Sequence, residues 1–100
     1  MYKPLPPFLE IKDSDIEGKG IFVNTDLPKG IILGLTHIRD KEFPDDLIRT
    51  PLGGFINHAN LPNCKLIQTG RLFFIETKKA IKAGNEITLR YRIAKLEQKW

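Results

Sequence analysis

Apolar and polar positions alternate along this chain in short runs that are separated by turn residues, a pattern typical of strands. The longest β-branched run predicts a central strand, in which Gly34 marks a bulge or a close backbone approach. Thr69-Gly70-Arg71 lies between two apolar runs and predicts a hairpin. Strands are predicted over residues 8–12, 21–23, 31–38, 65–68, 72–76 and 86–89.

Helical patterning is scarce. Residues 39–52 contain Pro44 and Pro51 and predict at most one helical turn, and only the tail places apolar residues on one helical face. Many short strands with little helix predict a mostly β fold of several small sheets. Residues 1–7 are expected to be an extended, proline-rich lead-in, and residues 92–100 a short C-terminal tail.

The length of 100 residues predicts one small domain, spanning residues 1–100, near the lower size limit for a self-sufficient core. No apolar run approaches the roughly 20 residues that span a bilayer, and residues 1–7 lack the apolar region of a signal peptide. We therefore expect a cytoplasmic protein with no membrane partner. The single cysteine, Cys64, excludes an internal disulfide and a multi-cysteine zinc cluster, and no metal is expected.

Charge is unevenly distributed along the chain. The net charge is +4, with 7 basic and 9 acidic residues in positions 1–50 and 9 basic and 3 acidic residues in positions 51–100. A basic half is typical of nucleic-acid binding, but Lys78, Lys79 and Lys82 flank a predicted turn, where lysines commonly face water. No nucleic-acid partner is expected, and a small basic nucleic-acid-binding β domain is the least favoured alternative.

Residues 53–64 concentrate the polar chemistry of the chain around Asn57, His58 and Pro62. Pro62 fixes φ and lacks an N–H, so the segment predicts a compact loop. Phe55-Ile56 is strand-like, which would let Asn57 and His58 leave a buried strand end with directed donors and acceptors. In the alternative interpretation the amides satisfy their own backbone and the histidine is structural.

Three motifs follow one another in a distinctive order: Gly18-Lys19-Gly20, then Asn57-His58 with Pro62-Asn63-Cys64, then Gly84-Asn85-Glu86-Ile87 with Tyr91. In this order they resemble the SET-domain family of protein lysine methyltransferases, in a minimal version similar to the small viral and bacterial SET proteins. The resemblance runs from about Leu9 to Tyr91. It implies a SET-type β fold with a C-terminal pseudoknot that brings Tyr91 beside Asn57-His58.

The same resemblance implies an enzyme that transfers a methyl group from S-adenosyl-L-methionine to a lysine side chain of a protein or peptide, with S-adenosyl-L-homocysteine as the product. Methyl transfer of this kind is an in-line displacement at a carbon that its sulfonium already activates. The protein must therefore mainly orient the two reactants and exclude water, which requires no metal.

The cofactor site implied by the resemblance involves both loops and the tail. The Gly18–Gly20 turn would let backbone atoms approach the methionine end of the cofactor, and Lys19 could face its carboxylate. Asn57 would bind the ammonium or carboxylate, and the His58 backbone would pair with the adenine edge, although its ring could equally just brace the loop. Trp100 would stack on adenine or, alternatively, pack against the core or a second copy.

Tyr91 is the predicted catalytic residue and is also predicted to contact the cofactor. Its phenol would hold the incoming amine and direct the lone pair at the methyl carbon. Because an ammonium is not a nucleophile, an apolar channel that lowers the lysine pKa by desolvation would help. Phe55, Phe74 and Leu89 are candidate channel walls, although each could equally be a core residue.

The region between the predicted strands also suggests how a substrate is attracted. Asp45 and Asp46 belong to a short acidic insert that would attract a cationic lysine-bearing segment. Arg90 stands where the family usually has an acidic residue, which keeps open a catalytically weak or inactive module that binds only cofactor or peptide. Self-association into a homodimer would cover apolar surface that so small a core leaves exposed.

Overall fold

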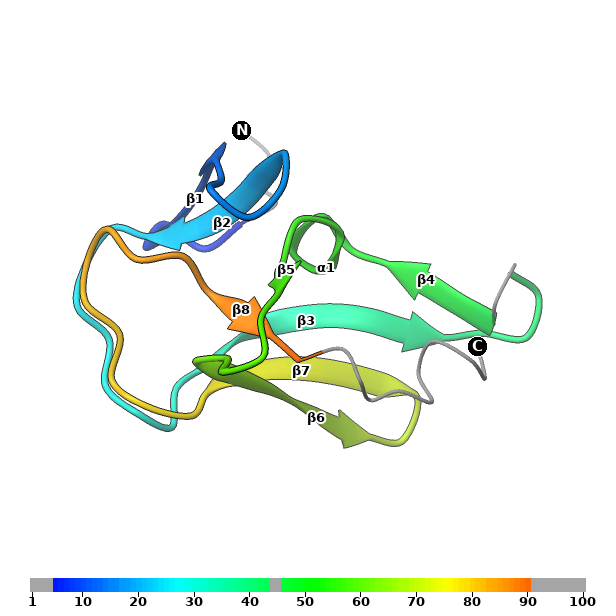
Figure 1. Ribbon diagram of the computed structural model, residues 1–100. Helices are drawn as coiled ribbons and strands as arrows, with labels where there is room; N and C mark the ends of the chain where they lie inside the picture. The colour runs from blue at the N-terminus through cyan, green and yellow to red at the C-terminus, as the bar shows by residue number, and fades with distance from the viewer. Residues whose placement is uncertain (1–4, 44–45, 91–100) are drawn as a thin grey trace.

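The computed structural model of the protein describes residues 5–43 and 46–90, which form short strands in three small sheets and one helical turn (Figure 1). The mostly β fold predicted from the sequence is thereby confirmed. In chain order the elements are β1 (Leu9–Asp13), β2 (Lys19–Val23), β3 (Ile32–Arg39), β4 (Leu47–Arg49), α1 (Pro51–Gly54), β5 (Asn57–His58), β6 (Cys64–Thr69), β7 (Leu72–Thr77) and β8 (Thr88–Leu89).

The largest sheet has four antiparallel strands in the order β4-β3-β7-β6. β3 lies inside this sheet, as its β-branched sequence predicts. β6 and β7 form the predicted hairpin, with Thr69 opposite Leu72 at the turn. The sequence thus predicts three of the four strands of this sheet, which are β3, β6 and β7.

Gly34 lies at an irregularity of β3. The pairing of β3 with β7 shifts register between Ile32 and Gly34. Gly34 has a φ of +152°, and a Cβ at this position would lie 2.9 Å from Leu52 Cδ2 of α1. The register shift confirms the predicted irregularity at Gly34, whereas the close approach is made by a side chain of α1 and not by another backbone.

The structure differs from the predicted elements between residues 46 and 58. β4 was not predicted, because its three residues are too short for a periodic signal. Thr50 caps α1 by accepting from Gly53 N, and Pro51 stands at its first position. Phe55 is the C-cap of this turn, so the strand expected at Phe55-Ile56 begins two residues later, at Asn57.

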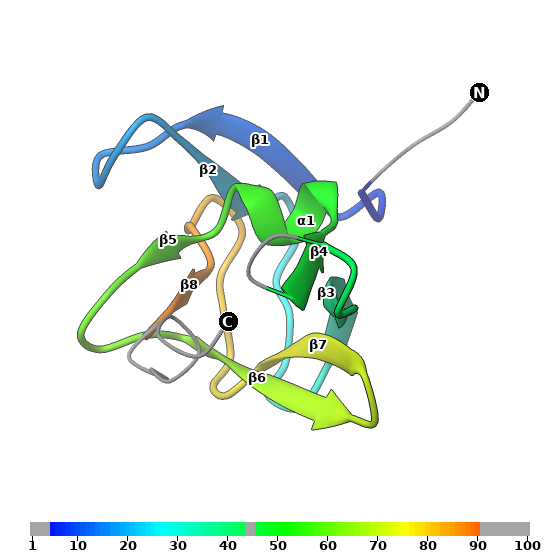
Figure 2. The same cartoon turned by 90° about the vertical axis from the view of Figure 1, so that its right-hand side faces the viewer.

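The two smaller sheets are joined through the segment that precedes β8. β1 and β2 form an antiparallel hairpin, and β5 and β8 pair in parallel. Glu86 bridges Phe22 of β2, and Ile87 N donates to Ile21 O at 2.8 Å. In Figures 1 and 2 this segment runs from the β1–β2 hairpin to β8 beside β5, and it thus connects the N-terminal turn to the central loop.

One core is shared by all three sheets. Ile21 of β2, Ile75 of β7 and Ile87 before β8 are each fully buried. Two polar side chains of β3 are buried with them: Thr36 Oγ1 donates to Phe73 O at 3.1 Å, and His37 Nδ1 lies 3.0 Å from Thr36 Oγ1. Since the hydroxyl proton is used by Phe73 O, Nδ1 is the donor of the second bond.

Within residues 5–43 and 46–90, no helix has the length and apolar character that crossing a membrane requires.

Two adjacent glycines of α1 provide a matched test of its packing on β3. A Cβ on Gly53 would overlap the backbone O of Thr36, whereas a Cβ on Gly54 would meet only Arg49 Cδ at 3.7 Å. Gly53→Ala should therefore lower the free energy of unfolding by about 1–3 kcal/mol, because backbone must move. Gly54→Ala should change it by less than about 0.5 kcal/mol. Urea unfolding of both variants measures this, and equal losses would contradict the close approach.

The stability of the fold should decrease in mild acid because of His37. Burial, with a smaller contribution from the charge of Arg49, lowers the pKa of His37 from 6.5 to about 4. Between these values the unfolded chain binds more protons, so the His37 contribution is complete above pH 6.5 and is lost as the pH falls toward 4. The loss is at most about 3 kcal/mol. Thermal unfolding from pH 7 to 5 should have a smaller pH slope in His37→Gln than in the wild type, and an equal slope would contradict this role of His37.

Candidate functional site

The first glycine turn and the asparagine loop meet at the side chain of Asn57. Its Nδ2 lies 3.2 Å from Glu17 O, on the turn between β1 and β2, and 3.1 Å from Lys19 O, at the start of β2. It also lies 3.0 Å from Ser14 Oγ and 2.8 Å from Glu86 Oε2. The structure thus brings together parts of all three segments that the sequence predicts to share a site, with Glu86 contributing from the third.

Asn57 presents its amide in one orientation. Carbonyl and carboxylate oxygens only accept hydrogen bonds, so the atom that faces Lys19 O and Glu86 Oε2 must be the nitrogen. Oδ1 of Asn57 accepts no hydrogen bond from residues 5–43 or 46–90. This oxygen, on a half-buried residue, is an acceptor suited to a ligand with a positively charged N–H group.

Ser14 and Glu86 are parts of this site that sequence reasoning missed. Ser14 Oγ donates to Glu86 Oε1 at 2.8 Å and accepts from Ile16 N at 2.9 Å, which also shapes the turn. Glu86 belongs to the Gly84-Asn85-Glu86-Ile87 motif, so the sequence contains a signal for this residue, but the motif alone does not indicate its role. Ser14 carries no comparable signal, because it lies in an ordinary polar turn.

The two glycines of the first turn have different roles. Gly18 has a φ of +48° and open space around it, so the turn conformation requires it. At Gly20 a Cβ would overlap Glu86 Oε2 and would lie 3.2 Å from Asn57 Nδ2. Gly20 is therefore needed to make room for the Glu86 carboxylate.

The charged or polar groups of Lys19 and His58 have partners within their own segments. Lys19 Nζ lies 2.6 Å from Asp13 Oδ1, and this hydrogen bond, together with the lysine charge, lowers the pKa of Asp13. The exposed pair must open before Lys19 can face a cofactor carboxylate, and solvent-exposed ion pairs open at little cost. The exposed ring of His58 lies 3.4 Å from Asn60 Oδ1, as expected if the ring braces the loop.

Asn63 holds the end of the loop against the segment that leads into β8. Its Nδ2 donates to Glu86 O at 2.9 Å, and its Oδ1 accepts from Thr88 N at 2.9 Å. Asn63 N also donates to Thr88 Oγ1 at 3.2 Å. The asparagine of the Pro-Asn-Cys motif thus satisfies backbone groups that a neighbouring strand would otherwise pair.

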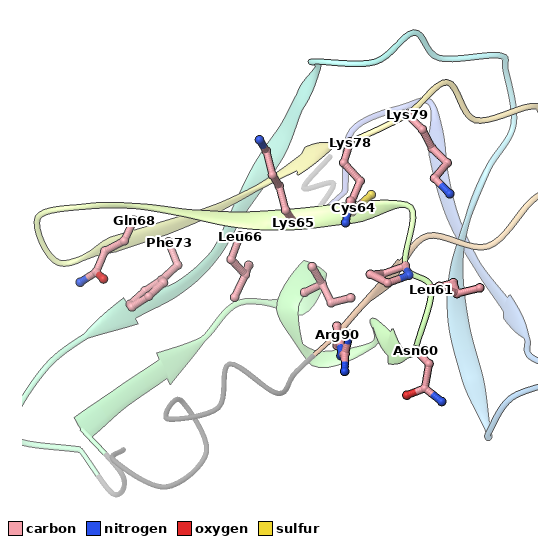
Figure 3. A pocket seen from close by; sticks show the side chains of 12 residues that line it. Asn60, Leu61, Cys64, Lys65, Leu66, Gln68, Phe73, Lys78, Lys79 and Arg90 are labelled. Carbon is pink, nitrogen blue, oxygen red and sulfur yellow. The ribbon is translucent and has the colours of Figure 1, made fainter.

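A cavity of about 730 Å³ opens beside the same loop, from Asn60 onward (Figure 3). Its volume is in the range of small-molecule sites. Apolar groups from β6, β7 and β8 contribute much of its lining, and Lys65, Lys78, Lys79 and Arg90 contribute its charges. Burial raises the pKa of the Cys64 thiol to about 12, so at neutral pH this lining residue is a protonated thiol without nucleophilic character.

The three predicted channel walls do not lie together. Leu89 is buried and lines the cavity. Phe74, the second predicted wall, does not line the cavity, whereas its neighbour Phe73 does. Both residues belong to β7, and successive residues of a strand point to opposite faces of the sheet. Phe55 is 39% exposed at the end of α1 and is not among the lining residues. Of the three, only Leu89 lies at this cavity.

Tyr91, Trp100 and Asp45 lie outside the described residues, so their predicted roles stay predictions. The description ends at Arg90, which lines the cavity directly after β8. Asp46 is exposed, with a φ of +59°, in the loop between β3 and β4. Figure 1 places this loop at the opposite end of the molecule from the β1–β2 hairpin.

Within residues 5–43 and 46–90 there is no group of three acidic, histidine or cysteine side chains that could hold a metal.

Replacing Asn63 should loosen the site, whereas replacing a neighbouring asparagine should not. Asn63→Ala removes two side-chain hydrogen bonds to the backbone of Glu86 and Thr88. We expect a loss of about 2–3 kcal/mol in the free energy of unfolding, because these backbone groups are left without partners. Asn60→Ala, at an exposed loop position, should change it by less than about 0.5 kcal/mol. Denaturant titration compares the two variants, and losses of similar size would refute the role of Asn63.

Comparisons with known proteins agree with this architecture. The family model described as SET domain matches residues 38–92. Among 149 matching chains of solved structures is the crystal structure of a proposed histone methyltransferase from Plasmodium falciparum. It has 20% sequence identity and a TM-score of 0.67, and the match covers 83% of this chain and 91% of that chain. At this identity the likeness shows a shared fold. The curated proteins gave no match.

Proposed function

Because this chain belongs to the SET-domain family, whose members are generally methyltransferases, we propose that it is an S-adenosyl-L-methionine-dependent protein-lysine N-methyltransferase. The observation that carries the proposal is the meeting of Asn57 with the turn that contains Gly18 and Gly20. This contact joins two segments 38 residues apart in the sequence at one polar site.

The chemistry of this site fits the methionine end of the cofactor. Asn57 Oδ1 has no donor among the described residues, and an ammonium supplies the donor that it needs. The backbone of the Gly18–Gly20 turn and of His58 would complete the binding site. The bound cofactor would supply an activated methyl carbon, so these residues have only to hold it in place.

The reaction further needs an unprotonated lysine amine. We place Tyr91 at this step, where its phenol would hold the amine in line with the methyl carbon. Leu89 and Phe73 make part of the cavity wall apolar, and removal of water lowers the pKa of an entering lysine ammonium. The charge of Arg90 lowers that pKa further but also opposes the approach of the cation, so its effect on turnover has two opposing components.

The substrate would be a protein or peptide segment that carries the lysine and further positive charge. Asp46, with Asp45, would contribute to its attraction through long-range electrostatics rather than through contact with the cavity. Lys41 and Arg49 lie close in the sequence and reduce this field. The acidic loop would therefore mainly affect the KM for basic peptides.

Transfer of a labelled methyl group to lysate proteins tests the proposal. Tyr91→Phe should lower transfer at least about 100-fold, because the amine loses its positioning hydrogen bond, and Tyr2→Phe is the matched control that should retain transfer.

In the same assay Asp46→Lys should raise the KM for a basic peptide, and an unchanged KM would remove the acidic loop from the proposal.

Calorimetry with S-adenosyl-L-homocysteine separates the alternatives. Tyr91→Phe should still bind this product, since Asn57 is intact. Binding by the wild type without transfer would favour the catalytically weak or inactive module, which the position of Arg90 on the cavity wall keeps in competition. If the wild type bound no cofactor, the proposed function would be refuted.

A further inference from the structure

We propose that Glu86 is a positioning residue that fixes the Asn57 amide with its nitrogen toward the protein and its oxygen toward the ligand. The part of this inference that concerns ligand binding rests on the proposed function. The part that concerns the orientation of Asn57 rests on the geometry alone.

The Glu86 carboxylate uses both of its oxygens within the site. Oε2 accepts from Asn57 Nδ2 at 2.8 Å, and Oε1 accepts from Ser14 Oγ at 2.8 Å. Hydrogen bonds to an ionised acceptor are roughly twice as strong as neutral ones. A rotated Asn57 amide would place Oδ1 against this carboxylate and against Lys19 O, so Glu86 makes the alternative orientation unfavourable.

The backbone of Glu86 is itself fixed from two sides. It bridges Phe22 of β2, and its carbonyl accepts from Asn63 Nδ2 at 2.9 Å. Gly20 leaves the space that the carboxylate occupies. The carboxylate is therefore held at a defined place by groups that belong to β2, to the asparagine loop and to the first turn.

The contacts of Glu86 differ from those of a structural ion pair. Within the described part of the chain no lysine, arginine or histidine forms a salt bridge with it. Its charge acts on the Asn57 amide instead, on the nitrogen side. A negative charge at this place also favours a positively charged group at Asn57 Oδ1, which is the chemistry of an amino-acid ammonium.

The first arm of the test observes Asn57 directly, without any ligand. In the wild type, the side-chain NH₂ protons of Asn57 should resonate apart and exchange slowly with solvent, because they are bonded to Glu86 and the turn. In Glu86→Ala their separation should collapse toward that of an exposed asparagine. Glu86→Gln should largely preserve it, since a glutamine can offer its oxygen to Asn57 Nδ2 and its NH₂ to Ser14 Oγ.

The second arm measures the dissociation constant of S-adenosyl-L-homocysteine by calorimetry. Glu86→Ala should weaken binding at least 10-fold, and Glu86→Gln should weaken it less. Gly20→Ala is an independent variant, because its methyl group displaces the carboxylate sterically, and it should resemble Glu86→Ala in both arms. Glu76→Gln is the control: this carboxylate of β7 lies 3.7 Å from Lys65 Nζ and should leave both arms unchanged.

The outcomes separate this inference from the proposed function. Unchanged Asn57 resonances in a folded Glu86→Ala, or in Gly20→Ala if Glu86→Ala does not fold, would overturn the positioning role. Collapsed resonances with unchanged affinity would overturn its relevance to the ligand. If the wild type bound no S-adenosyl-L-homocysteine, the proposed function would fail, whereas the resonances would still decide whether Glu86 orients Asn57.

Discussion

The site depends on the pairing of one short segment with partners on both of its sides. Residues 84–87 pair with β2, where Val23 N donates to Asn85 O at 3.0 Å, and the chain then continues into β8, which pairs with β5. The N-terminal turn belongs to the β1–β2 sheet and the asparagine loop to the β5–β8 sheet, and these two sheets do not share a strand. This double pairing is what brings Asn57 to the turn, and the side-chain contacts refine a proximity that the backbone has already established.

The strands predicted from the sequence are those that are long enough to show a pattern of apolar and β-branched residues. β3, β6 and β7 are six or more residues long, and the pairing of β3 with β7 shifts register at Gly34. β4 has three residues and α1 has four, so their formation depends on tertiary partners such as Thr36, whose backbone O accepts from Thr50. Local sequence cannot report such partners.

The same limit applies to the site. The resemblance to the SET-domain family indicated Asn57 and the first turn, because those residues stand in recognisable motifs. The contact of Ser14 with Glu86 joins residues 72 positions apart, and the need for a glycine at position 20 is visible only when that carboxylate is in place. A residue that acts through another side chain can be recognised only from the distance between the two side chains. A single sequence does not contain that distance.

So small a fold, with many loops, must satisfy its backbone without long strands. Short polar side chains replace the missing neighbours: Thr77 Oγ1 accepts from Ile31 N at 2.9 Å and donates to Pro28 O at 2.8 Å. Asn63 does the same for the chain that enters β8. As a result, no buried side-chain nitrogen or oxygen of the described residues lacks a partner.

The parallel pairing of β5 with β8 involves only two residues on each strand, Asn57 opposite Thr88 and His58 opposite Leu89. The β6–β7 hairpin, in contrast, is paired over six residues on each strand. Local opening free energies follow the number of cooperating contacts, so β5 and β8 can separate while the four-stranded sheet stays intact. Amide hydrogens at residues 57–59 would then exchange through a sub-global fluctuation, which would give a ligand or product a route into and out of the site without unfolding of the domain.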